Sequence, residues 1–189
     1  MTMGNIANIE FYTTPEGDVM VKEVGQPAKQ LKDSDRELIG RLLTIINDRY
    51  PQAHRALMNL YSKSTMNRVY YEYKVVHRFI RCNFGEYDQY NIDVDKNGTF
   101  RMEEVRCPLR GECTFEGIIC KPVLDTRLSD REMEVFSMVV DNMSKDEIAS
   151  ALCISPFTVD RHRDNIKAKI GVRSIAEMIN YWYTNNLHK

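Results

Sequence analysis

Hydrophobic residues recur at helical spacing through the last third of the chain, and four serines stand where short helices would begin. Ser129 and Ser144 are each followed three residues later by a glutamate, which is the capping-box arrangement at the start of a helix. Ser155 is followed by a proline, the residue favoured in the first turn, and Ser174 follows the helix-breaking Gly171. The pattern therefore predicts four short helices. Their expected core positions are Leu128, Val135, Ile148, Leu152, Ile154, Val159 and Ile166.

The third of these helices differs from the others because basic and polar side chains accompany its apolar stripe. Val159, Ile166 and Ile170 form the stripe, and the other face can offer hydrogen-bond donors to phosphates and base edges. The donors are carried by Arg161, His162, Arg163, Asn165, Lys167 and Lys169. A solvated surface helix would explain such a face more simply. The four caps and the tight turn before the basic helix instead favour a helix-turn-helix that binds DNA.

The same segment resembles a known family of regulators. LSDREMEV, SKDEIASALCIS, TVDRHRDNIKAKIGV and the helix that follows match the LuxR/GerE-type helix-turn-helix domain in order and spacing, over about a third of the chain. The resemblance implies a transcriptional regulator whose third helix enters the major groove of double-stranded DNA. The side chains expected at the DNA are Ser155, Thr158, Arg161, His162, Asn165 and Lys169. Asp160 departs from the family, which usually has lysine there, but Arg161 and Arg163 keep the helix basic.

The fourth helix has an apolar face with two explanations. Ile175, Met178 and Trp182 recur at helical spacing, and they can pack on their own domain or against a second copy of the chain. Because the fourth helix commonly dimerises in the LuxR family, the resemblance implies a homodimer with these three residues at its interface. Cys153, in the turn before the basic helix, is expected to be a core residue.

The N-terminal part has a mixed pattern. Residues 9–24 alternate around Pro15-Glu16-Gly17-Asp18 and predict a β-hairpin. Helical periodicity follows over residues 35–48, with Ser34 as the expected cap, and Pro51 should begin a second helix. The stretch 70–84 is ambiguous, and alternation over residues 79–84 predicts that it ends in a strand.

A second hairpin is expected over residues 92–105, around Asp95-Lys96-Asn97-Gly98. The domain boundary is expected between Lys121 and Arg127, where Pro122 interrupts any helix. The chain is therefore predicted to have an α+β N-terminal domain, residues 1–121, and an all-α four-helix LuxR-type helix-turn-helix domain, residues 122–189.

Four of the five cysteines form a candidate metal site. Cys107, Cys113 and Cys120 lie in one glycine-containing loop, and Cys82 lies on the predicted strand before it. Four thiolates suit a tetrahedral zinc ion or an iron–sulfur cluster, and zinc is favoured because a structural clamp would order an irregular loop. Small free cysteines that fill a core are the alternative.

A second motif lies in the predicted hairpin. Residues 93–104 have oxygen-bearing side chains at the first, third, fifth and twelfth positions and glycine at the sixth, as in an EF-hand calcium loop that would begin at Asp93 and end at Glu104. The flanking residues are extended or turn-like, whereas an EF-hand needs a helix on each side. An ordinary hairpin turn explains the segment better, so calcium is not expected.

Composition narrows the setting in which the protein works. The chain has 189 residues, 43% hydrophobic content and a formal net charge of −1, without an apolar run long enough to span a membrane. Met1 to Glu10 lacks the basic start and apolar run of a signal peptide, so the expected location is cytoplasmic and the cysteines are expected to be thiols or ligands. The near-neutral charge argues against indiscriminate binding to nucleic acid.

The predicted function is a sequence-specific transcriptional regulator that binds DNA as a homodimer and can contact the transcription machinery. Two alternatives remain: a metal- or redox-sensing regulator controlled by the cysteine cluster, and an adaptor whose helix-turn-helix binds protein. An enzyme is not expected, because no motif orders Cys107 or Cys113 with His54 or His77 as a nucleophile pair.

Overall fold

The structure is a computed structural model of the whole chain, and it describes residues 6–85, 87, 92–94, 99–185 and 187. The chain divides into two compact units, residues 1–123 and residues 124–189. Within the described residues, none of the helices has the length and apolar character needed to cross a bilayer.

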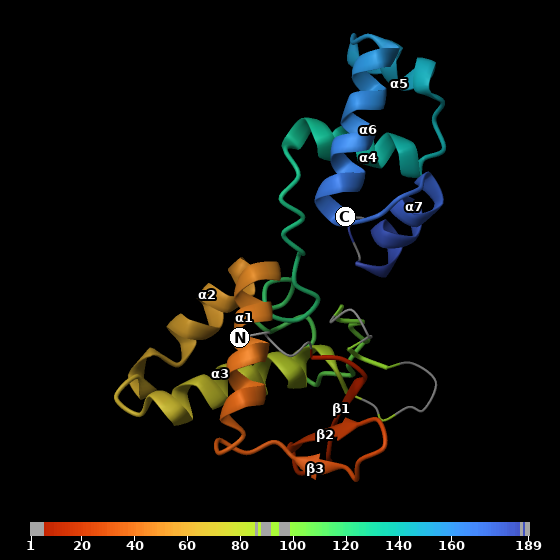
Figure 1. The fold of residues 1–189 in the computed structure, drawn as a ribbon. Coiled ribbons are helices and arrows are strands. Elements are labelled where there is room, and N and C mark those ends of the chain that lie inside the picture. The colour runs from red at the N-terminus through yellow and green to blue at the C-terminus, as the bar shows by residue number, and fades with distance from the viewer. Residues whose placement is uncertain (1–5, 86, 88–91, 95–98, 186, 188–189) are drawn as a thin grey trace. The chain divides into compact units, whose positions relative to one another are not determined.

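The N-terminal unit begins with a small antiparallel sheet in the order β1-β2-β3 (Figure 1). Strand β1, Ile9–Thr13, pairs with β2, Val19–Glu23, and the short β3, Lys29–Gln30, pairs with β2. Gly17 turns the chain between the first two strands with a φ of 93°, a conformation that glycine adopts without strain. The predicted hairpin over residues 9–24 is confirmed.

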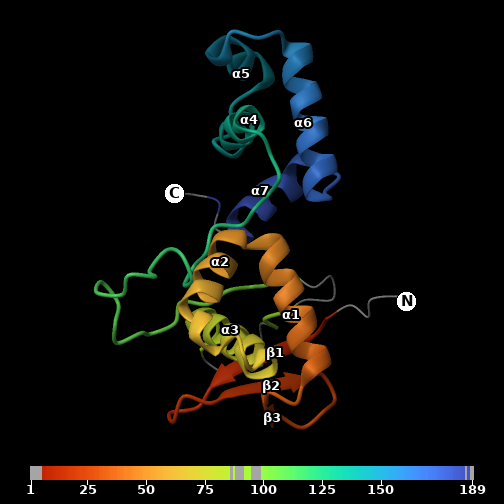
Figure 2. The ribbon, with the colours of Figure 1, turned by 90° about the vertical axis from the view of Figure 1, so that its left-hand side faces the viewer.

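Three helices lie on one side of this sheet (Figure 2). They are α1, Arg36–Arg49, α2, Pro51–Leu60, and α3, Arg68–Asn83, with a short 3₁₀ turn, Ser62–Ser64, before the last. The first two match the expected helices closely. The predicted cap is displaced by one residue, because Asp35 and not Ser34 precedes α1, and its carboxylate accepts the Lys32 N–H at 2.8 Å.

The predicted strand at residues 79–84 is wrong, because α3 continues through it to Asn83. The buried side chains of α3 are Tyr71, Val75, Val76, Phe79, Ile80 and Asn83. Buried residues that recur every three to four positions are typical of a helix, whereas a strand would bury alternate residues. Cys82 therefore lies in the last turn of a helix.

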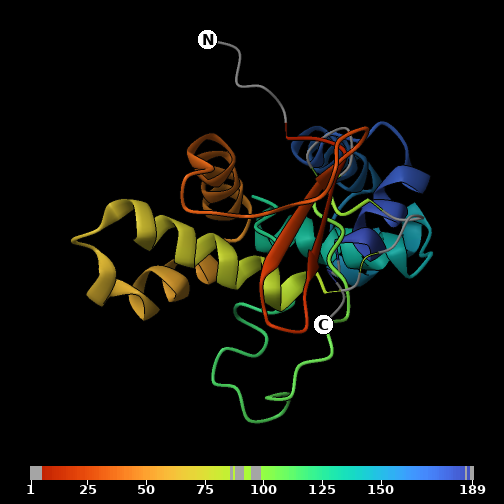
Figure 3. The same ribbon diagram turned by 90° about the horizontal axis from the view of Figure 1, so that it is seen from below.

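Beyond α3, the described part of the N-terminal unit has no helix and only isolated bridges. Val94 pairs antiparallel with Ile9 and with Phe100, which joins the two sides of the predicted second hairpin. The expected turn at residues 95–98 lies outside the described residues. From there to residue 123 the chain forms a long loop, which projects away from the helices of this unit (Figures 2 and 3).

The C-terminal unit consists of four helices, and all four predicted caps are confirmed. They are α4, Asp130–Val140, α5, Lys145–Leu152, α6, Pro156–Ile170, and α7, Ile175–Thr184. Ser129 and Ser144 form complete capping boxes with the glutamates three residues on. Gly171 ends α6 with a φ of 75°.

One hydrophobic core holds these four helices together. Val135, Ile148, Val159 and Ile166 are fully buried in it, and Leu128, Leu152 and Ile154 pack partly buried against its edge. The expected core is therefore confirmed, with three of its members at the periphery. The fold class is also confirmed: a small sheet with helices, followed by an all-helical domain.

Candidate nucleic-acid interface

Helices α5 and α6 form the helix-turn-helix, joined by a turn with a left-handed residue at its start. Cys153 ends α5 with a φ of 53°, and the Ile154 N–H then donates to the Ala149 carbonyl at 3.0 Å. Ser155 caps the next helix. The expectation that Cys153 is a core residue is wrong, because the left-handed turn leaves its side chain exposed.

The first turn of α6 is held by two hydroxyl groups. The Thr158 N–H donates to Ser155 Oγ at 3.1 Å, and the hydroxyls of the two residues lie 2.8 Å apart at hydrogen-bond distance. Both predicted DNA contacts therefore have local partners, which fix the turn. Between them, Phe157 is 79% exposed. An aromatic side chain with this exposure at the start of the helix was not singled out in the sequence.

The outward face of α6 is defined by residues four positions apart. Phe157, Arg161 and Asn165 are all exposed, whereas Val159 and Ile166 are completely buried against the other helices. Since residues at this spacing line one side of a helix, these three side chains form a single row. We call Phe157, Arg161 and Asn165 the recognition row.

The charges of α6 leave one cation available on this row. Asp164 pairs with Lys167 at 2.8 Å, and Arg163 donates to the Met143 carbonyl at 3.5 Å. Lys169 pairs with Glu132 on α4. Among the contacts of the described residues, Arg161 is the basic side chain of α6 that has neither an ion pair nor a hydrogen bond.

Asp160, which departs from the resemblance, is also accounted for. Its carboxylate pairs with the Lys145 ammonium at 3.1 Å, so it connects α6 to the first turn of α5. Both partners are about half-exposed, and such pairs contribute roughly 0–1 kcal/mol. The pair nevertheless neutralises the negative charge that Asp160 places on α6.

Two further predicted contacts turn partly inward. His162 is half-buried, and its Nδ1 atom is buried without a hydrogen-bond partner among the described residues. The Lys169 ammonium lies 2.6 Å from the carboxylate of Glu132 on α4, whose side chain is only 6% exposed. Lys169 therefore ties the end of α6 to α4, and a phosphate would have to compete with Glu132 for it.

Glu132 is kept ionised by these bonds. Burial alone would raise the pKa of its carboxyl group, but hydrogen bonds from Lys169 and from the Ser129 N–H and hydroxyl outweigh burial and lower the pKa below its ordinary value of 4.5. A group with a pKa lowered by folding stabilises the fold above its unfolded pKa, and that stabilisation is lost as the pH falls through the folded pKa.

Lys169→Met is expected to lower the free energy of unfolding of the C-terminal unit by about 1–2 kcal/mol at neutral pH, because Glu132 then keeps only its Ser129 bonds. The difference should shrink at acid pH, where Glu132 is protonated in both proteins. Denaturation followed by the fluorescence of Trp182, the single tryptophan, measures both values. Lys167→Met is the control, because its partner Asp164 is 72% exposed, and equal losses in the two variants would contradict the structural role of Lys169.

Comparison with known proteins agrees with this geometry. The model of the luxR family of bacterial regulatory proteins (GerE) matches residues 126–182, which include α4, α5, α6 and most of α7. Residues 126–182 are a LuxR-family helix-turn-helix domain.

Similar proteins match this LuxR-family domain over part of their length. The chain is 43% identical over 56 residues to "Fimbriae Z protein" of Escherichia coli (strain K12), covering 30% of this chain and 27% of that protein. It is 33% identical over 84 residues to "Transcriptional regulatory protein MctR" of Rhizobium johnstonii, covering 44% and 36%, respectively. With "Response regulator protein VraR" of Staphylococcus aureus it shares 32% identity over 94 residues, covering 45% of each chain. The chain thus spans less than half the length of these relatives.

The last helix of the LuxR-family domain carries the three residues predicted at a dimer interface. Met178 is completely buried and Trp182 is 8% exposed, and the Trp182 ring packs edge-on against Phe136 with centroids 4.9 Å apart. Two of the three predicted interface residues thus belong to the domain's own core, because their spacing faces α4. Ile175 is 37% exposed and is the one that remains accessible.

The four candidate metal ligands are all free thiols, but they do not form a closed site. Cys107 is exposed, and Cys82, Cys113 and Cys120 are half-buried. Across the described residues, which include all four, no three histidine, cysteine, aspartate or glutamate side chains are grouped so as to hold a metal ion. The single-zinc geometry predicted from the spacing is therefore not formed in this conformation.

The acidic segment 93–104 is only partly described, since residues 95–98 lie outside the described residues. At its start, Asp93 is 2% exposed, and its carboxylate accepts the Phe11 N–H at 2.6 Å. At its end, Glu104 pairs with Lys121 at 3.1 Å. The two terminal carboxylates of the EF-hand pattern are thus engaged with the protein itself.

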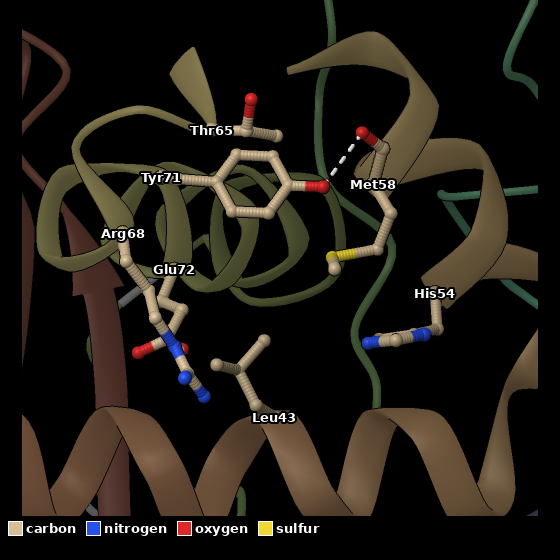
Figure 4. A pocket seen from close by; sticks show the side chains of 7 residues that line it. All are labelled: Leu43, His54, Met58, Thr65, Arg68, Tyr71 and Glu72. Atoms are coloured by element: carbon tan, nitrogen blue, oxygen red, sulfur yellow. Dashed lines mark hydrogen bonds and ion pairs between the residues drawn. The ribbon is translucent and has the colours of Figure 1, made fainter. Parts of the chain in front are cut away.

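A pocket of about 410 Å³ opens between the three helices of the N-terminal unit (Figure 4). It is lined by Leu43, His54, Met58, Thr65, Arg68, Tyr71 and Glu72. The Tyr71 hydroxyl donates to the Met58 carbonyl at 2.9 Å, and Glu72 is paired with Arg36 and Arg68. Burial lowers the pKa of His54, which keeps its imidazole neutral at pH 7. The pocket therefore offers mostly neutral and apolar groups to solvent.

Proposed function

We propose that this chain is a sequence-specific DNA-binding transcriptional regulator in which α6 enters the major groove. The observation that carries the proposal is the recognition row, an exposed line of Phe157, Arg161 and Asn165 on the basic helix of a LuxR-family domain. Arginine suits guanine edges and phosphates, asparagine suits adenine, and a phenyl ring suits the methyl group of thymine. Two relatives named as transcriptional or response regulators support the same function.

Selection of binding sites from random duplex DNA by the purified full chain tests this function. The proposal expects enrichment of one sequence motif, bound far more tightly than unrelated DNA at the same salt concentration. A pool that stays random through successive rounds would overturn it and favour the adaptor function, in which the helix-turn-helix binds protein.

We also propose that the chain binds its operator as a homodimer, although only one of the three interface residues implied by the resemblance is exposed. Ile175, at the start of α7, is exposed and remains accessible to a second copy. A two-fold dimer reads two inverted half-sites about one helical turn apart, so the selected motif should be an inverted repeat. A single unrepeated half-site would remove the dimer from the proposal. Contacts with the transcription machinery would follow once such a dimer occupies a promoter.

The exposed ring of Phe157 is proposed to contact a thymine methyl group in the selected operator. Replacing that thymine with deoxyuridine removes only the methyl group. The loss of about 0.8 kcal/mol of binding free energy should weaken binding roughly fourfold. The same replacement should not weaken DNA binding by Phe157→Ala, because the substitution and the base change remove the same contact. Arg161→Ala is the control and should still respond to uracil. Equal responses by the wild type and Phe157→Ala at every thymine would contradict the contact.

Control of this regulator through its cysteines is the alternative function that we retain. A metal- or redox-sensing regulator should change its operator affinity when a chelator or a thiol oxidant is added. Unchanged affinity under both treatments would separate DNA binding from the cysteines.

A further inference from the structure

Four cysteines of the N-terminal unit lie in or next to a loop that contributes little to the hydrophobic core. Residues 107–120 carry three of them, and this segment forms turns and one isolated bridge but no helix or strand. Ile119 is its one completely buried hydrophobic residue, whereas Leu109 and Ile118 are 49% and 38% exposed. Cys107 is exposed. Burial of small apolar thiols in a core therefore does not account for these cysteines.

Asn83 closes the base of this loop next to Cys82. Its carbonyl accepts the Glu103 N–H at 2.9 Å, and its side-chain amide donates to the Ile119 carbonyl at 2.9 Å. The side-chain oxygen of Asn83 accepts the Lys121 N–H, also at 2.9 Å. Asn83 is completely buried. Both ends of the loop thus meet at the residue after Cys82, and the two bonds to the later end lie on either side of Cys120.

Inside the loop, polar turns hold the other two cysteines. The Cys107 carbonyl accepts the Arg110 N–H at 3.1 Å, and the Cys113 N–H donates to Leu109 at 3.0 Å. The Glu116 carboxylate accepts the Gly111 N–H at 2.7 Å and pairs with Arg110 at 3.3 Å. These bonds fold the loop back on itself, and Glu116 forms a parallel bridge with Cys120.

The thiols are close enough to influence one another. The Cys82 thiol interacts electrostatically with Arg78 and with the thiols of Cys120, Cys107 and Cys113. Neutral thiols bind thiophilic metals with release of protons, because only the thiolate is a ligand.

We propose that Cys82, Cys107, Cys113 and Cys120 together form a four-thiolate centre for a thiophilic metal, either one zinc ion or an iron–sulfur cluster. Each of the four thiols gives up its proton as its sulfur becomes a ligand, and no oxidant is required. The loop must draw in toward the end of α3, since the thiols are not gathered around one point in this conformation. The loop has turns and no helix or strand to break in that movement, and the Asn83 bonds hold its ends.

Metal analysis of the full chain, purified anaerobically without chelator, tests the proposal and requires no DNA. We expect either one zinc per chain or iron with acid-labile sulfide and a brown colour. The result distinguishes a zinc site from an iron–sulfur cluster. Replacing any one of the four cysteines with serine should remove most of the metal. Cys153→Ser is the matched control and should keep it, because Cys153 lies in the other unit.

Cobalt chloride added to the reduced, metal-free wild type is the second measurement, because a serine variant can lose metal simply by misfolding. We expect a thiolate-to-cobalt absorption band that saturates at one ion per chain, with release of about four protons at most. Native protein without zinc or iron and no thiolate band with cobalt would overturn the proposal. Full metal retention by any one of the four serine variants would overturn the four-ligand set.

Discussion

Trp182→Ala is expected to destabilise the C-terminal unit by about 3–5 kcal/mol, the usual effect of removing a large buried aromatic side chain. The indole is 8% exposed and packs edge-on against Phe136, so its loss leaves a cavity between α7 and α4. A domain of this size has only about 5–15 kcal/mol of stability to lose. Circular dichroism during thermal unfolding should show a markedly lower transition temperature for the C-terminal helices.

Ile175→Ala is the matched control for this variant because it removes an aliphatic side chain from the same helix. Ile175 is 37% exposed, so the change should lower stability by less than about 1 kcal/mol. If Trp182→Ala kept wild-type stability and changed only the oligomeric state in sedimentation, Trp182 would be an interface residue and its placement in the core would be wrong.

Arg161→Ala is expected to weaken binding to the selected operator by about 1–3 kcal/mol, or roughly 5- to 150-fold. Arg161 is exposed at the centre of the recognition row and has no ion pair or hydrogen bond among the described residues, so its guanidinium is available to DNA. The two possible targets give different signatures. Loss of a phosphate contact should reduce the slope of log affinity against log salt concentration by about one unit. Loss of a guanine contact should instead relax specificity at one base pair.

Arg41→Ala removes the same charge from α1 in the N-terminal unit and is the control. Its affinity and salt dependence should match the wild type. If Arg161→Ala also matched the wild type in both measurements, α6 would not be the helix that reads the operator.

The local signals in the sequence predicted much of the C-terminal domain correctly. Ser129, Ser144, Ser155 and Ser174 were identifiable as caps because a cap bonds to backbone only a few residues away. The strand predicted at residues 79–84 failed because a six-residue stretch can fit both periods. The helix is decided by its continuation from Arg68 and by packing of α3 against α1 and α2.

The parts of the site that the sequence did not reveal depend on distant residues. Lys169 and Glu132 are 37 positions apart, and no periodicity shows that a basic residue on α6 will pair with a buried carboxylate on α4. The apolar face of α7 had two compatible partners, and only packing against α4 selects one. Phe157 did carry a signal, since an aromatic residue directly after a capped Ser-Pro start falls outside the apolar stripe.

Methylation protection of the selected operator tests the central proposal most directly, because dimethyl sulfate modifies guanine N7 in the major groove and adenine N3 in the minor groove. With α6 in the major groove, the wild-type chain should protect guanine N7 positions within each half-site. Arg161→Ala should lose at least one of these protections at concentrations that saturate the DNA. Tight binding that leaves every guanine N7 in the operator reactive, or protects only adenine N3, would contradict major-groove recognition by this helix.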